Sequence, residues 1–219
     1  MDSQQLLWRV MMLVPMILSL TVHEFAHAWS AAKLGDDTAE RMGRLTLNPL
    51  SHIDLIGTIL LPLMGIPFGW AKPVPVNPVR FNRKVTMSTG MMITAAAGPI
   101  SNMILAVLCT VIYGLLIRYA PQTLVSQSTG DTGVSLLLQL GITINVALAL
   151  FNLIPVPPLD GSRVVDGLIP ARMRSRWENF TRLAPFLLIG VMVFGGVLIR
   201  GPSRVAHEWL NALLRFIAS

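Results

Sequence analysis

Thr21-Val22-His23-Glu24-Phe25-Ala26-His27-Ala28 is the stretch from which the fold and chemistry of this chain can be read. It contains two histidines four residues apart, with a glutamate beside the first. On a helix this spacing places both imidazoles on one face, about 6 Å apart. They can then share one zinc ion, and the glutamate can accept a proton from a water beside the metal. The pattern alone is weak, because two hydrogen-bonded core histidines have the same spacing.

The residues around this motif are those of a membrane helix. From Val10 to Leu20 the chain is almost entirely apolar, and the apolar character continues beyond His27. Ionisable side chains are costly inside a bilayer and are usually retained there for a function. The context therefore favours a metal site over a structural pair of histidines. A zinc site of this kind needs a third protein ligand and an open position for water.

The composition indicates an integral membrane protein with one domain over residues 1–219. The chain is 53% hydrophobic and 13% charged, and its mean hydropathy is +0.62. Its net charge of +6 comes from basic residues grouped between apolar segments, as the positive-inside rule predicts. No phosphate-binding loop or zinc-finger spacing is present, so we expect no nucleic-acid partner. The single cysteine, Cys109, excludes an internal disulfide.

The apolar segments predict an all-α polytopic membrane protein with about four spanning helices. These helices are expected at residues 5–34, 89–119, 134–153 and 183–199. Residues 52–69 are also apolar, but basic residues flank them on both sides, and a crossing would put one cluster on the wrong side. We expect this segment to re-enter the bilayer or lie on its surface. In the tail, residues 203–217 have apolar side chains at helical spacing and predict an interfacial helix.

A short extended, β-like segment is expected after the re-entrant one. Prolines 73, 75 and 78 forbid a helix there and favour extended backbone. An extended edge at the membrane surface can pair with another extended chain, and a rigid linker is the alternative interpretation.

Asp160 is the best candidate for the third metal ligand. It follows the proline-rich turn at 155–158, where the third predicted helix ends. With the N-terminus outside, the first and third helices both run inward, so Asp160 and the two histidines reach the same half of the bilayer. Asp54, which opens an apolar run, is the competing carboxylate. The remaining acids considered are assigned to solvated charged loops: Asp36, Asp37, Glu40, Asp166 and Glu178.

The chain resembles the site-2 protease family of intramembrane zinc metalloproteases. The matching motifs are His23 to His27, Ala97-Gly98-Pro99-Ile100-Ser101-Asn102, and Asn152 through Gly161. The resemblance implies zinc ligation by His23, His27 and Asp160, with Glu24 as general base and acid. It also implies that Asn152 holds the substrate or its developing oxyanion. Asn102 is expected to hydrogen-bond between helices, with substrate contact as the alternative. The segment at 69–77 looks like the family's substrate-presenting strand, and its candidate substrate contacts are Trp70, Val74 and Val76.

The resemblance implies zinc-dependent hydrolysis of peptide bonds in or near transmembrane segments of other proteins. The expected cofactor is one Zn²⁺ per chain, and the expected partners are a transmembrane protein substrate and membrane lipid. We expect a multi-pass protein of a prokaryotic plasma membrane. We expect no PDZ or cystathionine-synthase-type domain, which many relatives carry, within residues 1–219. A catalytically silent binding protein and a transporter are the alternative functions.

Overall fold

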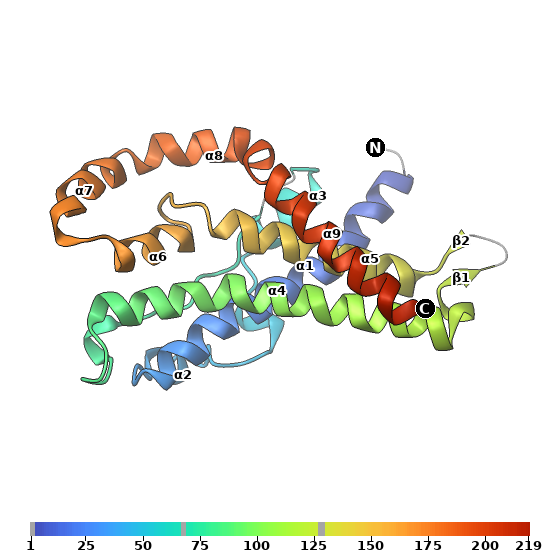
Figure 1. Cartoon of the computed structure of the whole chain (residues 1–219), viewed down its shortest axis with the longest axis horizontal. Coiled ribbons are helices and arrows are strands. Elements are labelled where there is room, and N and C mark those ends of the chain that lie inside the picture. The colour runs from blue at the N-terminus through green and yellow to red at the C-terminus, as the bar shows by residue number, and fades with distance from the viewer. Residues whose placement is uncertain (1–2, 67–68, 127–129) are drawn as a thin grey trace.

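The computed structural model describes residues 3–66, 69–126 and 130–219 and is built almost entirely of helices (Figure 1). Three long helices form its centre: α1 (Ser3–Lys33), α4 (Met87–Tyr119) and α5 (Gly133–Asn152). Their ends lie within two residues of the first three predicted spans. All three are long and apolar enough to cross a membrane. The prediction of an all-helical chain with apolar spans is confirmed.

The predicted fourth span is present as α8 (Ala184–Leu198), a helix of 15 residues. A span of typical thickness needs about 20 residues, so α8 alone is short. Together with the preceding segment, which contains α7 (Arg174–Arg182), it forms a pair that is long enough but bent by 70°. The structure therefore has three candidate spans, or four if the bent pair counts as one, within the described residues.

The apolar segment that begins near residue 52 turns back on itself. A stretch of π-helix, η2 (Leu55–Leu60), continues into α3 (Leu61–Leu63), and the chain reverses at Gly65, whose φ is +85°. The returning chain is tied to η2, because the Thr58 hydroxyl donates to the Trp70 carbonyl oxygen at 2.7 Å. This segment is not among the candidate spans, and its reversal agrees with the expected return to one side. Residues 67–68 lie outside the described chain.

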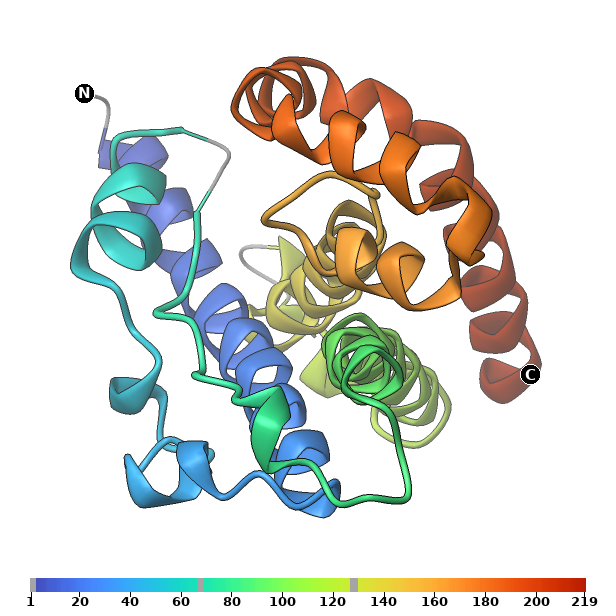
Figure 2. The same cartoon turned by 90° about the vertical axis from the view of Figure 1, so that its left-hand side faces the viewer.

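Residues 69–77 form neither a helix nor a strand, and they run beside α1 toward the short turn η3 (Figure 2). Their β-like pairing with another chain therefore stays a prediction. Among the described residues, the two assigned strands are β1 (Val125–Ser126) and β2 (Gly130–Asp131), an antiparallel pair in the loop between α4 and α5. The remaining short elements are α2 (Thr38–Arg41), η1 (Pro49–Ser51), η3 (Pro78–Arg80), η4 (Pro121–Thr123), α6 (Asp160–Leu168) and η5 (Ala171–Met173).

Different short helices and strands lie at the two ends of the helix bundle. Figure 1 shows α2, α6 and α7 at the end where α4 begins and α5 finishes, and the β1–β2 pair at the opposite end. The segments at the first end contain basic residues that lie between the apolar spans, such as Arg83 and Arg172. Because basic residues favour the inner side of a membrane, their grouping at this end supports the predicted inward direction of α1 and α5.

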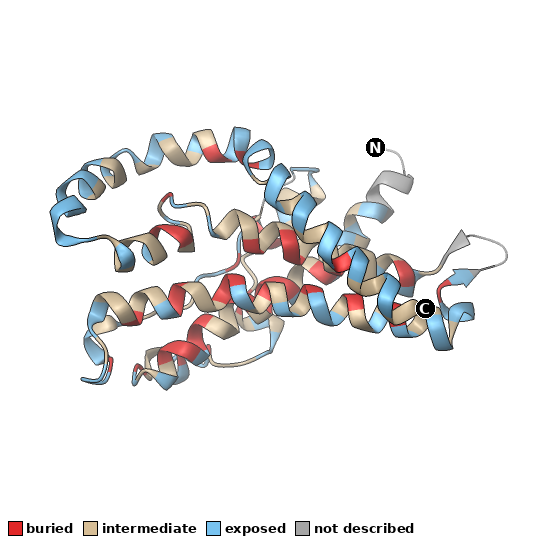
Figure 3. Ribbon diagram, in the orientation of Figure 1, coloured by how far each residue is buried: buried red, intermediate tan, exposed pale blue. Residues whose placement is uncertain are grey.

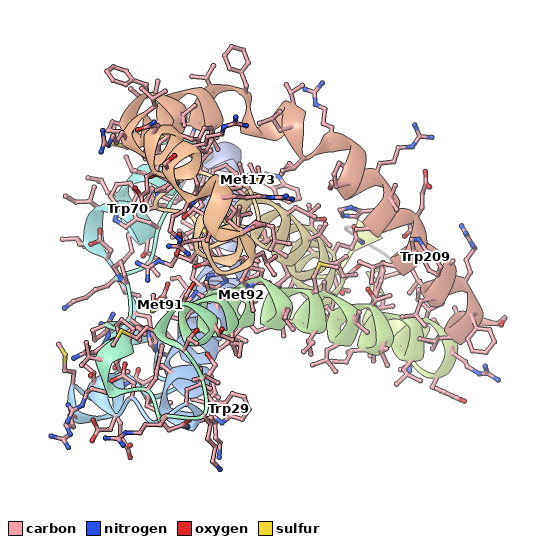
Figure 4. The ribbon with its side chains drawn as sticks, turned by 60° about the vertical axis from the view of Figure 1, so that its left-hand side comes forward. Trp29, Trp70, Met91, Met92, Met173 and Trp209 are labelled. Carbon is pink, nitrogen blue, oxygen red and sulfur yellow. The ribbon has the colours of Figure 1, made fainter. Side chains whose placement is uncertain are left out.

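The tail is a helix, α9 (Arg200–Ala218), but it packs against α4 and α5. Leu210 is buried against Ala106 and Val146, and Gly114 of α4 leaves space for Ile217. The sequence predicted a separate interfacial helix, and this packing makes the tail part of the bundle instead. Small residues on α4 allow the close approach. Trp209 lies on the outer face of α9 and is 75% exposed (Figure 4).

Buried positions gather where α1, α4 and α5 face one another, while most of α7 to α9 is exposed (Figure 3). The buried residues are largely small or polar, such as Ala28, Ala149 and Asn145. Large apolar side chains point outward, as Ile100 and Ile104 do on α4. Small residues inside and large apolar residues outside are typical of helices that pack within lipid.

Candidate metal centre

Helix α1 places His23 and His27 on one buried face, as the four-residue spacing predicts. Their rings meet edge to face with centroids 4.6 Å apart, and their Nε2 atoms are 3.1 Å apart. Only 5% of His23 and 8% of His27 is exposed. The two Nε2 atoms therefore converge on one point inside the bundle.

Asp160 completes this group from the first residue of α6. Its Oδ2 lies 3.1 Å from the Nε2 of His23 and 3.3 Å from the Nε2 of His27. The next residue, Gly161, packs so tightly on the backbone that any Cβ would collide with the carbonyl oxygens of Leu153 and Ile154. The glycine thus lets the turn close, and the turn carries Asp160 to the histidines.

The three ligand atoms have the spacing of a zinc site. Tetrahedral zinc with bonds of about 2.0–2.1 Å places neighbouring ligand atoms about 3.3 Å apart. The three observed separations, 3.1, 3.1 and 3.3 Å, are close to that value. Among the described residues, His23, His27 and Asp160 are the group of His, Cys, Asp or Glu side chains placed to hold a metal ion. Three protein ligands leave a fourth position for water or substrate.

The hydrogen bonds behind the imidazoles select the tautomer that can bind a metal. Nδ1 of His27 lies 2.7 Å from the carbonyl oxygen of Thr94, which can only accept, so this Nδ1 carries the proton. Nδ1 of His23 lies 2.6 Å from Oδ1 of Asn102. In both rings the lone pair is then on Nε2, which faces the metal position.

The orientation of the Asn102 amide is set by its other contacts. Its Nδ2 donates to Oδ1 of Asn145 at 2.7 Å and to the carbonyl oxygen of Ser19 at 3.2 Å. Nδ2 of Asn145 donates in turn to the carbonyl oxygen of Gly141 at 2.7 Å. Because these acceptors fix both amides, Oδ1 of Asn102 faces His23 and accepts its proton. Asn102 and Asn145 are fully buried, at 0% and 1% exposure.

Gly98 allows α4 to approach the imidazoles. A Cβ at this position would lie 2.5 Å from Cε1 of His27 and 2.6 Å from Cε1 of His23. Real Cβ atoms do not approach other atoms so closely, so a side chain there would displace the rings. The Ala97-Gly98-Pro99 motif thus has a packing role directly against the candidate ligands.

Asp160 contributes a carboxylate to the candidate metal group, with its Oδ2 directed at Nε2 of both His23 and His27. The carboxylate form is the one that ligates metal. Asp54, the competing carboxylate in the sequence, lies elsewhere. Its Oδ1 accepts from the backbone N–H groups of Ile56 and Gly57 and so caps η2. The structure brings Asp160, and not Asp54, to the two histidines.

Glu24, the residue after His23 in α1, contacts the segment at 69–77. Its Oε2 accepts a hydrogen bond from the backbone N–H of Val74 at 2.8 Å. Val74 and Val76 are half-buried in this segment, and Trp70 at its start is 41% exposed (Figure 4). Asn152 lies at the end of α5, where its Nδ2 donates to the carbonyl oxygen of Leu148 at 3.0 Å.

Sequence reasoning missed several residues around this site. It placed Asp36 in a solvated loop, and this is wrong, because Asp36 is fully buried. It also gave no role to Asn145 or to Arg44, which is 7% exposed. An asparagine within an apolar helix is a usable signal, since polar side chains there seek partners. Nothing in the local sequence separates the buried Asp36 from its exposed neighbours.

Comparisons with known proteins agree with this geometry. The family model described as "Peptidase family M50" matches residues 11–194. The chain is 45% identical over 166 residues to "Putative zinc metalloprotease YwhC" of Bacillus subtilis, covering 75% of this chain and 72% of that relative. It is 34% identical over 152 residues to "Putative zinc metalloprotease Rip2" of Mycolicibacterium smegmatis, covering 69% of this chain and 54% of the relative. No solved structure gives a significant match.

A second Rip2, from Mycobacterium tuberculosis, is 32% identical over 157 residues, which cover 72% of this chain and 56% of that relative. The matched part thus spans a little over half of the two Rip2 chains. The family match extends from within α1 to within α8 and includes all three residues of the candidate metal group. The three to four apolar helices fit an integral membrane protein. By its sequence the chain belongs to peptidase family M50, the site-2 protease family of metalloproteases.

Proposed function

We propose that this protein is a zinc-dependent intramembrane endopeptidase that hydrolyses peptide bonds in or near transmembrane segments of other membrane proteins. One observation supports this most directly: Asp160 of α6 converges on His23 and His27, which lie with Glu24 on a helix apolar enough to span a membrane. The bacterial relatives support a prokaryotic plasma membrane as its location.

One zinc ion per chain is proposed to bind Nε2 of His23, Nε2 of His27 and Oδ2 of Asp160. When bound, this ion would supply Lewis acidity toward the scissile carbonyl and would make water nucleophilic near neutral pH. The hydrogen bonds at Nδ1 of both imidazoles leave Nε2 available as a ligand. Asn102, fully buried behind His23, is proposed to position this ligand and not to contact substrate.

Glu24 is proposed to be the general base and acid. It follows His23 directly in α1, and we propose that its carboxylate faces the water at the open metal position. There it accepts a proton from the attacking water and later transfers this proton to the leaving nitrogen. The bond from Val74 holds one carboxylate oxygen of Glu24, Oε2. Because a carboxylate is planar and rigid, the same bond also restricts the position of its second oxygen, Oε1.

Asn152 is proposed to donate a hydrogen bond to the substrate or its oxyanion. A side-chain amide has two N–H groups, and the bond to Leu148 uses one of them. Such a donor is typically worth about 3–4 kcal/mol of transition-state stabilisation. The segment at 69–77 is proposed to bind the substrate as an extended strand, with Trp70, Val74 and Val76 contacting its side chains. A membrane helix must unwind to expose its peptide bonds, and pairing with this segment would satisfy the freed backbone groups.

The direct test uses the purified protein in detergent with a membrane-embedded protein substrate. We expect cleavage by the wild type, loss of cleavage with a zinc chelator, and recovery when zinc is returned. Glu24→Gln should keep its zinc, measured by elemental analysis, and lose turnover. Cleavage by the Glu24→Gln variant at the wild-type rate would remove Glu24 from the mechanism. A wild type that binds the substrate with zinc present but never cleaves it would identify a silent binding protein.

A further inference from the structure

Two buried charged side chains outside the proposed metal group hold the segment that covers Glu24. They are Asp36 and Arg44, which lie on either side of α2 and are 0% and 7% exposed. Burying a charged group is costly unless strong hydrogen bonds compensate it. The hydrogen-bond partners of Asp36 and Arg44 therefore identify the part of the chain that these two buried charges hold in place.

Arg44 holds the beginning of the segment. Its guanidinium donates hydrogen bonds to the carbonyl oxygens of Lys72 and Pro73, and also to that of Ser51. All three acceptors are main-chain atoms. A planar guanidinium can hold several carbonyl oxygens in fixed directions, which a lysine cannot do. Beside this contact, the backbone N–H of Lys72 donates to the carbonyl oxygen of His52 at 2.8 Å.

Asp36 holds the end of the segment. Its Oδ2 accepts from the backbone N–H of Asn77 at 2.6 Å. Its Oδ1 accepts from the backbone N–H and the hydroxyl of Thr38. A carboxylate bound to N–H groups in this way makes charge-assisted hydrogen bonds, which are stronger than neutral ones. The two charged residues thus fix residues 72–73 and residue 77, with Val74 between them.

The register of this segment matters because Val74 lies between two prolines. Pro73 and Pro75 have no N–H, so Val74 is the sole backbone donor of the three. Its N–H reaches Oε2 of Glu24 at 2.8 Å. A slip of the segment by one residue in either direction would place a proline opposite Glu24. The hydrogen bond to Glu24 could not form in that register.

We propose that Asp36 and Arg44 are positioning residues for the proteolytic reaction. They hold residues 72–77 in the register that directs the Val74 N–H at Glu24, and through this bond they orient the carboxylate of the general base. The same contacts align the edge of the segment for an extended substrate. This inference rests on the proposed function, but its test is separate from that of the metal group.

The test compares Asp36→Ala and Arg44→Ala with the wild type in detergent, using one membrane-embedded substrate. We expect both variants to keep a full complement of zinc and to lose about 10- to 100-fold in kcat, since small misplacements of catalytic groups have effects of that size. Hydrogen–deuterium exchange should increase at residues 70–78 and stay unchanged in α4. Val74→Pro, which removes the N–H itself, should reproduce the loss in kcat with zinc retained.

The matched controls are Glu40→Ala and Arg41→Ala, which remove exposed charged side chains of α2 beside the same two residues. These variants should keep the wild-type kcat and exchange pattern. Asp36→Asn and Arg44→Lys are the conservative variants. Asp36→Asn should recover part of the lost kcat, because an amide oxygen still accepts from the backbone N–H of Asn77. The kcat of Arg44→Lys should stay close to that of Arg44→Ala, because a lysine cannot hold several carbonyl oxygens as a guanidinium does.

Wild-type kcat in Asp36→Ala and Arg44→Ala with increased exchange at 70–78 would overturn the positioning role. Loss of zinc in every variant of Asp36 and Arg44, the conservative ones included, would also overturn it, since the pair would then support the metal site itself. If the alanine variants do not fold, Asp36→Asn, Arg44→Lys and Val74→Pro decide by the same criteria. Turnover retained by Glu24→Gln would instead contradict the proposed function, so the two failures are distinguishable.

Discussion

Nδ1 of His23 lies 2.6 Å from Oδ1 of Asn102, and this contact joins two helices whose residues are 79 positions apart in sequence. It fixes which nitrogen of His23 carries the proton, so Nε2 faces His27 and Asp160. The contact is itself fixed by Asn145, which accepts from the other end of the Asn102 amide. The orientation of a proposed zinc ligand thus depends on a row of buried amides from α4 and α5.

Asn102→Ala is predicted to weaken zinc binding. Without the amide oxygen, the Nδ1–H of His23 has no acceptor, and the ring loses the tautomer and orientation that direct Nε2 inward. Loss of such a supporting hydrogen bond typically reduces metal affinity about 10- to 100-fold. Competition with a chelator of known affinity measures this change. Zinc affinity equal to that of the wild type would show that His23 is oriented without Asn102.

Two variants calibrate this measurement. Thr110→Val removes a different buried polar group from α4, a hydroxyl that donates to the carbonyl oxygen of Ala106 in the same helix. It should leave zinc affinity unchanged. Asn145→Ala removes one acceptor of the Asn102 amide but leaves Ser19 as the other. Its loss of affinity should therefore lie between those of Thr110→Val and Asn102→Ala.

Gly98→Ala is predicted to disturb both histidines at once. The added methyl would lie 2.5–2.6 Å from the two imidazoles, so α4 must move away or the rings must turn. Overpacking of this kind costs about 1–3 kcal/mol of stability and should lower zinc affinity as well. Gly190→Ala and Gly196→Ala are matched controls, because an added Cβ meets nothing within 4 Å at either position. Equal zinc affinity and equal melting temperature in Gly98→Ala and the controls would contradict this assignment.

The three central helices and the proximity of Asp160 to His23 and His27 could be predicted from sequence, because they depend on local pattern and on helix direction. Apolar length gives the spans, and the direction of the first and third helices brings Asp160 toward His23. The burial of Asp36 could not be predicted, since its partner Asn77 is 41 positions away and the intervening chain is irregular. The packing of α9 was missed for a similar reason. Its apolar face fits both a membrane surface and the small residues of α4.

Gly114→Leu is predicted to release α9 from the bundle. A Cβ at this position already lies 3.0 Å from the side chain of Ile217, so a larger side chain must push α9 outward. We expect a lower melting temperature and faster proteolysis of the tail, with unchanged zinc content, because Gly114 lies far along α4 from Gly98, the residue that packs against His23 and His27. Gly201→Ala, where an added Cβ meets nothing within 4 Å, is the control. Wild-type melting and proteolysis in Gly114→Leu would show that α9 does not dock there in solution.

Asp160→Asn is predicted to weaken zinc binding, whereas Asp54→Asn should not. The amide at 160 keeps the size of the side chain but removes its negative charge, so the ion would be held mainly by two neutral imidazoles. Asp54 instead caps η2 through the N–H groups of Ile56 and Gly57, a role that an amide oxygen can largely retain. Zinc content after dialysis against a weak chelator measures both variants. Full zinc retention by Asp160→Asn together with loss in Asp54→Asn would exchange the roles assigned to these two carboxylates.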